Sequence, residues 1–259
     1  RHIDWKLFGR TDKLFVKRYE EETNLRCQLV VDCSGSMWYP GEVDPNGPEM
    51  NKLKFAVHGS AALMELFRRQ RDAVGLSLFS DSLESHMPAK ASNVHLRAVY
   101  QELEALLDES NDRRAETGAV DALHQIAEAS PRRSLVVVFS DLLDRGGDVD
   151  AMMAALQHLR HNKHEVVVFH VLDKATEVDF EFEDRPTIFQ DLETGTEIRL
   201  HPSEVRDSYT RRMSELRKEL ELRCSQYRVD WIDVDIAAGV YPVLSAYLAK
   251  RAKLRSSRF

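Results

Sequence analysis

Short apolar runs that alternate with helical patterns constrain the fold of this chain more than any other feature. The runs are rich in Val, Leu and Phe and largely lack polar alternation. Strands that are buried on both faces of a helix-covered parallel sheet have this composition. The predicted strands are residues 27–31, 73–79, 135–140, 165–172 and 227–234.

The segments between these runs carry apolar residues at helical spacing. The predicted helices are residues 52–71, 93–107, 118–129 and 148–159, one opened by Ser203 as its N-cap, and 243–253 after Pro242. Alternation of strands and helices favours a doubly wound α/β fold with a mostly parallel sheet of about six strands.

Two regions break this alternation. Residues 83–87 follow the second strand too closely for a crossover helix, so we expect an antiparallel edge strand. Residues 177–200 have the pattern of a β-hairpin insertion. We therefore expect one domain over residues 25–259, preceded by a lead-in arm over residues 1–24. The arm begins without Met and inside a patterned segment, so we expect that upstream sequence is missing. It could pack on the domain or bind a partner.

Composition narrows the functional classes. The 259 residues carry a net charge of −7, whereas sequence-independent nucleic-acid binding needs clustered positive charge. No apolar run approaches the ~20 residues of a membrane helix, so we expect no membrane contact from this chain. The three cysteines, Cys27, Cys33 and Cys224, are too scattered for a disulfide framework, which favours a reducing, cytoplasmic location.

The first strand runs directly into Asp32-Cys33-Ser34-Gly35-Ser36. In an extended segment alternate side chains share a face, so Asp32, Ser34 and Ser36 would point the same way. A carboxylate and two hydroxyls suit Mg²⁺, and Mn²⁺ or Ca²⁺ could substitute. The plainer alternative is a small polar turn with a helix cap, and Cys33 would face away as a buried thiol.

Two further loops belong to the same predicted edge of the sheet. Asp141 follows the strand 135–140, and Thr117 precedes a helix to which it could also offer a cap. The predicted metal ligands are then Asp32, Ser34, Ser36, Thr117 and Asp141. Asp81 and Asp144 also follow strands and could orient these ligands without binding the metal themselves. Asp144 fits a helix cap better.

Other candidates are weaker. His158, His161 and His164 are spaced at three residues, so a transition-metal site is conceivable, but solvated histidines near a helix end fit better. Ser34 lacks the G-x-S-x-G context of a hydrolase nucleophile. Asp32 could be the nucleophile of a phosphotransferase of the haloacid-dehalogenase type, but Ser34 stands where that motif needs its general acid.

The five predicted ligands resemble the metal-ion-dependent adhesion site of von Willebrand factor A domains: D-x-S-x-S, then Thr, then Asp. The segments 1–6 and 11–22 resemble the lead-in of a bacterial family known as domain of unknown function fifty-eight, and 74–80 and 247–251 are also typical of it. The loop 38–50 and the hairpin depart from that pattern.

The resemblance implies strand order 3-2-1-4-5-6 and a site above strands one and four. It also implies a non-enzymatic module in which an acidic residue of a partner completes the metal coordination. The expected partner is a MoxR-type AAA+ ATPase, for which the module would serve as an adaptor or co-chaperone.

Overall fold

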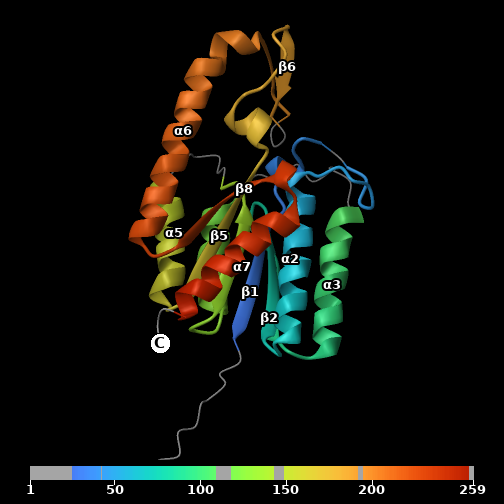
Figure 1. Ribbon diagram of the computed structural model, residues 1–259, viewed down its shortest axis with the longest axis vertical. Coiled ribbons are helices and arrows are strands. Elements are labelled where there is room, and N and C mark those ends of the chain that lie inside the picture. The colour runs from blue at the N-terminus through green and yellow to red at the C-terminus, as the bar shows by residue number, and fades with distance from the viewer. Residues whose placement is uncertain (1–24, 42, 109–117, 143–148, 192–194, 257–259) are drawn as a thin grey trace, which may run out of the picture.

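A computed structural model describes residues 25–41, 43–108, 118–142, 149–191 and 195–256, and its centre is a six-stranded sheet (Figure 1). The strand order is β3-β2-β1-β4-β5-β8, so the predicted order is confirmed. All neighbouring pairs are parallel except β2 with β3, the predicted antiparallel edge. The strands are β1 Arg26–Asp32, β2 Ala73–Phe79, β3 Leu83–Lys90, β4 Leu135–Ser140, β5 Glu165–Leu172 and β8 Asp230–Asp235.

Helices cover both faces of the sheet. They are α2 Lys52–Arg69, α3 Asn93–Asp108, α4 Ala119–Ala129, α5 Val149–His161, α6 Pro202–Gln226 and α7 Val240–Ser256. In β1, Leu29 and Val31 join a core with α2, α3 and α7, whereas Val30 joins a second core with α4, α5 and α6. The two buried faces explain why the central strands have no polar alternation.

Three predicted boundaries were wrong. Helix α6 begins at Pro202 after the N-cap His201, because a proline at the first helical position needs no N–H partner, so Ser203 lies inside the helix. Tyr227 is the C-cap of α6 and Arg228 has a left-handed φ of 59°, so the last strand starts at Asp230. Pro242 lies in the first turn of α7 and does not precede the helix.

The insertion between β5 and α6 contains the predicted hairpin, although it is shorter than expected. Its strands are β6 Thr187–Gln190 and β7 Glu197–Leu200, which pair antiparallel. A π-helical turn, η2 Lys174–Val178, precedes them. We call residues 174–191 and 195–200 the cap, since they lie above the carboxyl ends of the strands beside the start of α6 (Figure 1).

Candidate metal centre

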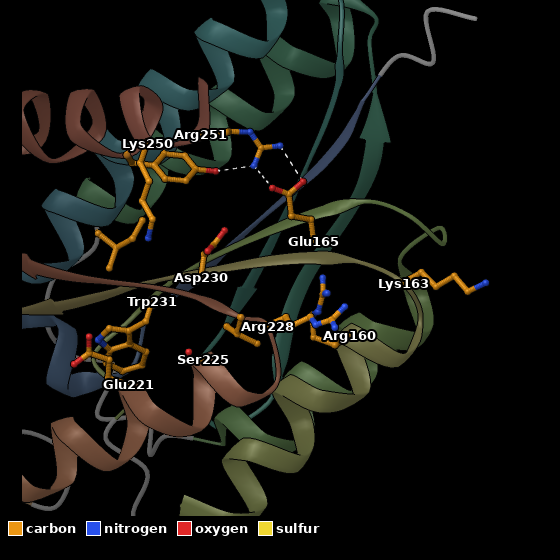
Figure 2. Close-up of a pocket in the computed structure, with 13 residues that line it drawn as sticks. Arg160, Lys163, Glu165, Glu221, Ser225, Arg228, Asp230, Trp231, Lys250 and Arg251 are labelled. Carbon is orange, nitrogen blue, oxygen red and sulfur yellow. Dashed lines mark hydrogen bonds and ion pairs between the residues drawn. The ribbon is translucent and has the colours of Figure 1, made fainter. Parts of the chain in front are cut away.

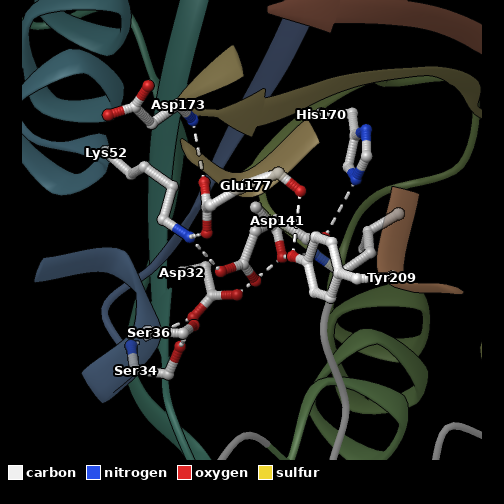
Figure 3. A network of polar contacts seen from close by, with 11 residues as sticks. Asp32, Ser34, Ser36, Lys52, Asp141, His170, Asp173, Glu177 and Tyr209 are labelled. Carbon is white, nitrogen blue, oxygen red and sulfur yellow. Dashed lines mark hydrogen bonds and ion pairs between the residues drawn. The ribbon is translucent and has the colours of Figure 1, made fainter. Parts of the chain in front are cut away.

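Asp32 and Asp141 lie side by side at the carboxyl ends of two neighbouring strands (Figure 3). Strands β1 and β4 pair in parallel with Val31 opposite Phe139, so both chains leave the sheet at the same edge. Both aspartates are fully buried. Open α/β sheets bind ligands at this edge.

The turn after β1 brings Ser34 and Ser36 to Asp32. The Ser34 backbone N–H donates to Asp32 Oδ1 over 3.0 Å, and the Ser34 and Ser36 hydroxyl oxygens lie 3.2 Å apart. Ser34 keeps an extended backbone, but a 3₁₀ turn, η1 Gly35–Trp38, starts directly after it. Asp32, Ser34 and Ser36 therefore lie together as the sequence suggested, although Ser36 is brought there by the turn and not by strand alternation.

Burial raises the pKa of Asp32 to about 7, and the nearby charge of Asp141 acts in the same direction. Hydrogen bonds from Ser140 Oγ, at 2.6 Å from Asp32 Oδ2, and from Ser34 oppose this shift. Among the residues that the structure describes, Asp32 forms no ion pair. A cation beside Asp32 would offset the cost of its buried charge.

Lys52, which sequence reasoning missed, supplies one positive charge to this site. Its side chain is fully buried, and its Nζ lies 2.7 Å from Asp141 Oδ2 and 2.6 Å from Glu177 Oε1 (Figure 3). Burial favours a lower pKa of Lys52, but the two carboxylates outweigh it and hold the pKa above its usual value. The sequence carried a signal that Lys52 is buried, because Lys52 shares a helical face with Phe55, Ala56 and Gly59.

His170 on β5 holds the backbone of Asp141. Its Nε2 lies 3.0 Å from the Asp141 carbonyl oxygen, to which it donates, and its Nδ1 lies 3.4 Å from Asp233 Oδ1. The hydrogen bond from His170, together with Arg217 and Trp231, lowers the pKa of Asp233 to about 2. These contacts fix the loop that carries Asp141 from the side of β5 and β8.

Thr117 and Asp144 lie outside the described residues, so their predicted roles stay predictions. Gly118, the residue after Thr117, donates its N–H to the Ser80 carbonyl over 2.6 Å. A Cβ at Gly118 would lie 1.9 Å from the Asp81 carbonyl oxygen, so the start of α4 packs tightly on the turn after β2. Asp81 is exposed and its Oδ1 accepts from the Ser80 and Ser82 hydroxyls. Its predicted role stays open.

The three histidines of the predicted transition-metal site, His158, His161 and His164, do not form a cluster. His158 Nδ1 lies 2.9 Å from His124 Nδ1, and the buried His164 accepts from the Ser134 N–H through its Nδ1. His161 is exposed. Cys33 is buried, and its Sγ donates to the Phe79 carbonyl, as expected for a thiol that faces away from the site.

The donors at the Asp32 edge fit a hard divalent cation. In the part of the chain that the structure describes, no group of three or more His, Cys, Asp or Glu side chains could hold a metal ion. A metal here would therefore depend on hydroxyls and water besides the two aspartates. Mg²⁺ prefers such oxygen ligands and usually keeps several waters.

A cavity of about 630 Å³ lies at the opposite ends of the strands, beside the starts of β5 and β8 (Figure 2). There the Arg251 guanidinium contacts the Glu165 carboxylate and lies 3.1 Å from the Tyr247 hydroxyl. The cavity has a mixed charged lining, and none of the candidate metal ligands takes part in it. It is therefore separate from the Asp32 site.

The sheet order, the antiparallel edge and the helices on both faces define a von Willebrand factor A-like α/β protein. The chain belongs to the family described as "Protein of unknown function DUF58", whose model matches residues 1–219. Both conclusions confirm the fold and the family inferred from the sequence, whereas the metal site and the partner stay predictions.

One relative is similar in sequence to most of this chain. "Uncharacterized protein Rv1480" of Mycobacterium tuberculosis is 26% identical over 215 residues, which cover 82% of this chain. The chain spans 62% of the length of that relative.

Among the described helices, none has a stretch long and apolar enough to cross a membrane.

Solved structures show the same fold at low identity. The conserved hypothetical protein BatB from Bacteroides thetaiotaomicron has a TM-score of 0.51 at 18% identity, covering 89% of this chain and 100% of its own. An aerotolerance-related membrane protein from Bacteroides fragilis has a TM-score of 0.50 at 16% identity, covering 86% and 98%. At these identities the two likenesses show the fold alone.

Proposed function

We propose that this chain is a metal-dependent protein-interaction module without enzymatic activity. Its ligand would be an acidic side chain of a partner protein, bound at the Asp32 edge of the sheet. The observation that carries the proposal is the pair of fully buried aspartates, Asp32 and Asp141. Among the described residues, only Asp141 of the two lies beside an ammonium group.

Asp32, Ser34, Ser36 and Asp141 would hold a Mg²⁺ ion together with Thr117, and Mn²⁺ or Ca²⁺ could replace it. The metal would supply a Lewis-acidic position to which an external carboxylate can bind. The protein's own part is to bury the aspartates, to orient Asp32 through Ser34 and Ser140, and to hold the Asp141 loop through His170.

The partner in this proposal is a MoxR-type AAA+ ATPase, and the chain serves as its adaptor or co-chaperone in the cytoplasm. This part of the proposal is what the family resemblance of the sequence implies. The phosphotransferase alternative needs Asp32 as a nucleophile, but Asp32 is buried and both of its carboxylate oxygens accept hydrogen bonds. No general acid lies two residues after it, so we do not favour that alternative.

Thermal unfolding with and without Mg²⁺ tests the metal. We expect millimolar Mg²⁺ to raise the melting temperature of the wild type and Asp32→Ala to abolish the rise. Glu104→Gln, a charge removal at an exposed position of α3, is the matched control and should keep the full response. An unchanged response in Asp32→Ala would place the metal elsewhere.

A pull-down tests the partner. Immobilised wild-type protein should retain an AAA+ ATPase from lysate in Mg²⁺, and both EDTA and Asp32→Ala should release it. Retention of the ATPase in EDTA would refute metal dependence, and phosphatase turnover that requires Asp32 would favour the enzyme alternative.

A further inference from the structure

Lys52 occupies a position that helix formation alone does not favour. It is the first residue of α2, where the positive end of the helix dipole repels a cation. Lysine is almost never fully buried unless it is paired. The side chain nevertheless turns into the site, 5.7 Å from the ring centre of Tyr39, and its ammonium lies between Asp141 and Glu177.

The neighbouring Lys54 shows what a purely structural buried lysine does in this helix. Its ammonium donates to three backbone carbonyls, those of Asp44, Gly47 and Glu49, at 2.7 to 2.9 Å. Those contacts close the loop before α2. Lys52 instead donates hydrogen bonds to two carboxylates from distant parts of the chain.

With a divalent metal bound, charge balance in the site requires one carboxylate besides the two aspartates. Asp32, Asp141 and Glu177 carry three negative charges when ionised and Lys52 carries one positive charge, so one divalent cation balances them. Without Glu177, the two aspartates, the lysine and a divalent cation would leave a net charge of +1. Glu177 therefore supplies the one negative charge that an external carboxylate would supply.

Glu177 belongs to the cap and is held by residues on three other segments of the chain. Its Oε1 accepts from Lys52, its Oε2 accepts from the Asp173 N–H over 2.8 Å, and its carbonyl accepts from the Tyr209 hydroxyl over 2.9 Å (Figure 3). Phe180, Phe182 and Phe189 of the cap form an aromatic cluster with Tyr209 of α6. The pair of Lys52 and Glu177 thus joins the cap to the site.

We infer that Lys52 is a second, carboxylate-binding cation of the site and that Glu177 is a resident carboxylate which a partner's acidic side chain must displace. This inference rests on the proposed function, in which the site receives an acidic residue. It adds that binding would release the cap from Lys52, so the partner must reach the site beside the cap.

Acetate rescue of Glu177→Ala tests the inference. The substitution removes the carboxylate and leaves space beside Lys52, so acetate should bind there in place of Glu177. At 100 mM sodium acetate, compared with 100 mM sodium chloride, we expect the melting temperature of Glu177→Ala to rise by about 3 to 5 °C, for a dissociation constant on the order of 10 mM. Acetamide, which is neutral and of similar shape, should have no effect.

Wild type and Glu181→Ala are the matched controls, since Glu181 is an exposed acid of the same cap. Neither should respond to acetate. The double variant Lys52→Met/Glu177→Ala should lose the response, and Lys52→Arg in the Glu177→Ala background should keep part of it. If the Met variant does not fold, the Arg variant and the acetamide comparison still decide the outcome.

An absent acetate response in Glu177→Ala overturns the inference, as does an equal response in all variants or an equal response to acetamide. The outcome is separate from the test of the proposed function, which is the Mg²⁺ response of wild type and its loss in Asp32→Ala. A Lys52-dependent acetate response without any Mg²⁺ response would keep Lys52 as the carboxylate-binding cation and reject the metal.

Discussion

Asp32→Asn should make the metal-free protein more stable at pH 8, because the substitution removes a buried charge that has no cation partner among the described residues. Burial and Asp141 raise the pKa of Asp32 from 3.8 to about 7. A shift of about 3 pKa units corresponds to roughly 4 kcal/mol. Asparagine keeps the shape of the side chain, but replacing charge-assisted hydrogen bonds from Ser34 and Ser140 costs about 1 kcal/mol. The expected net gain is about 3 kcal/mol.

The gain should depend on pH in a defined direction. Because the folded-state pKa lies above the unfolded-state value, the folded protein holds the proton more tightly, and wild type loses stability as pH rises from 3.8 through about 7. The variant has no such proton. Its advantage over wild type should therefore be largest at pH 8 and should shrink towards pH 5.

Urea unfolding in EDTA at pH 5, 6.5 and 8 measures this difference for wild type, Asp32→Asn and the control Glu104→Gln. The control should stay within about 0.5 kcal/mol of wild type at every pH, since Glu104 is exposed. In saturating Mg²⁺ the order should reverse, because only wild type keeps the metal ligand. A variant less stable than wild type at pH 8 in EDTA, or an advantage that does not change with pH, would refute the reasoning.

Two further substitutions test the surroundings of the site. Gly118→Ala should destabilise the protein by about 1–3 kcal/mol in urea unfolding, because its Cβ would lie 1.9 Å from the Asp81 carbonyl oxygen; an unchanged midpoint would mean that α4 does not begin against this turn. Lys54→Met should cost about 3 kcal/mol in the same measurement, because the carbonyls of Asp44, Gly47 and Glu49 lose their shared donor. Lys163→Met, at an exposed position, is its control, and equal effects of the two lysine variants would contradict the structural role of Lys54.

The sequence by itself determined the sheet and the edge that carries the candidate site. Apolar runs without polar alternation can be satisfied only by burial on both faces, and this local property identified the central strands. The short connection after the second strand identified the antiparallel edge. Because parallel strands end at one edge, Asp32 and Asp141 were placed together from their positions in the chain alone. Boundaries failed where proline or a left-handed residue decided them, as at Pro202 and Arg228.

The tertiary structure alone decided how the charges of the site are balanced. Lys52 and Glu177 are 125 residues apart, and Glu177 reaches the site only because the insertion folds back over the strand ends. Likewise the hydrogen bond from Ser140 to Asp32 joins residues 108 apart, and a 3₁₀ turn replaced the expected strand alternation at Ser36. An ion pair depends on distance in space and on burial, and neither is written in local sequence. The sequence therefore located the aspartates, whereas the fold supplied the lysine and the resident acid that surround them.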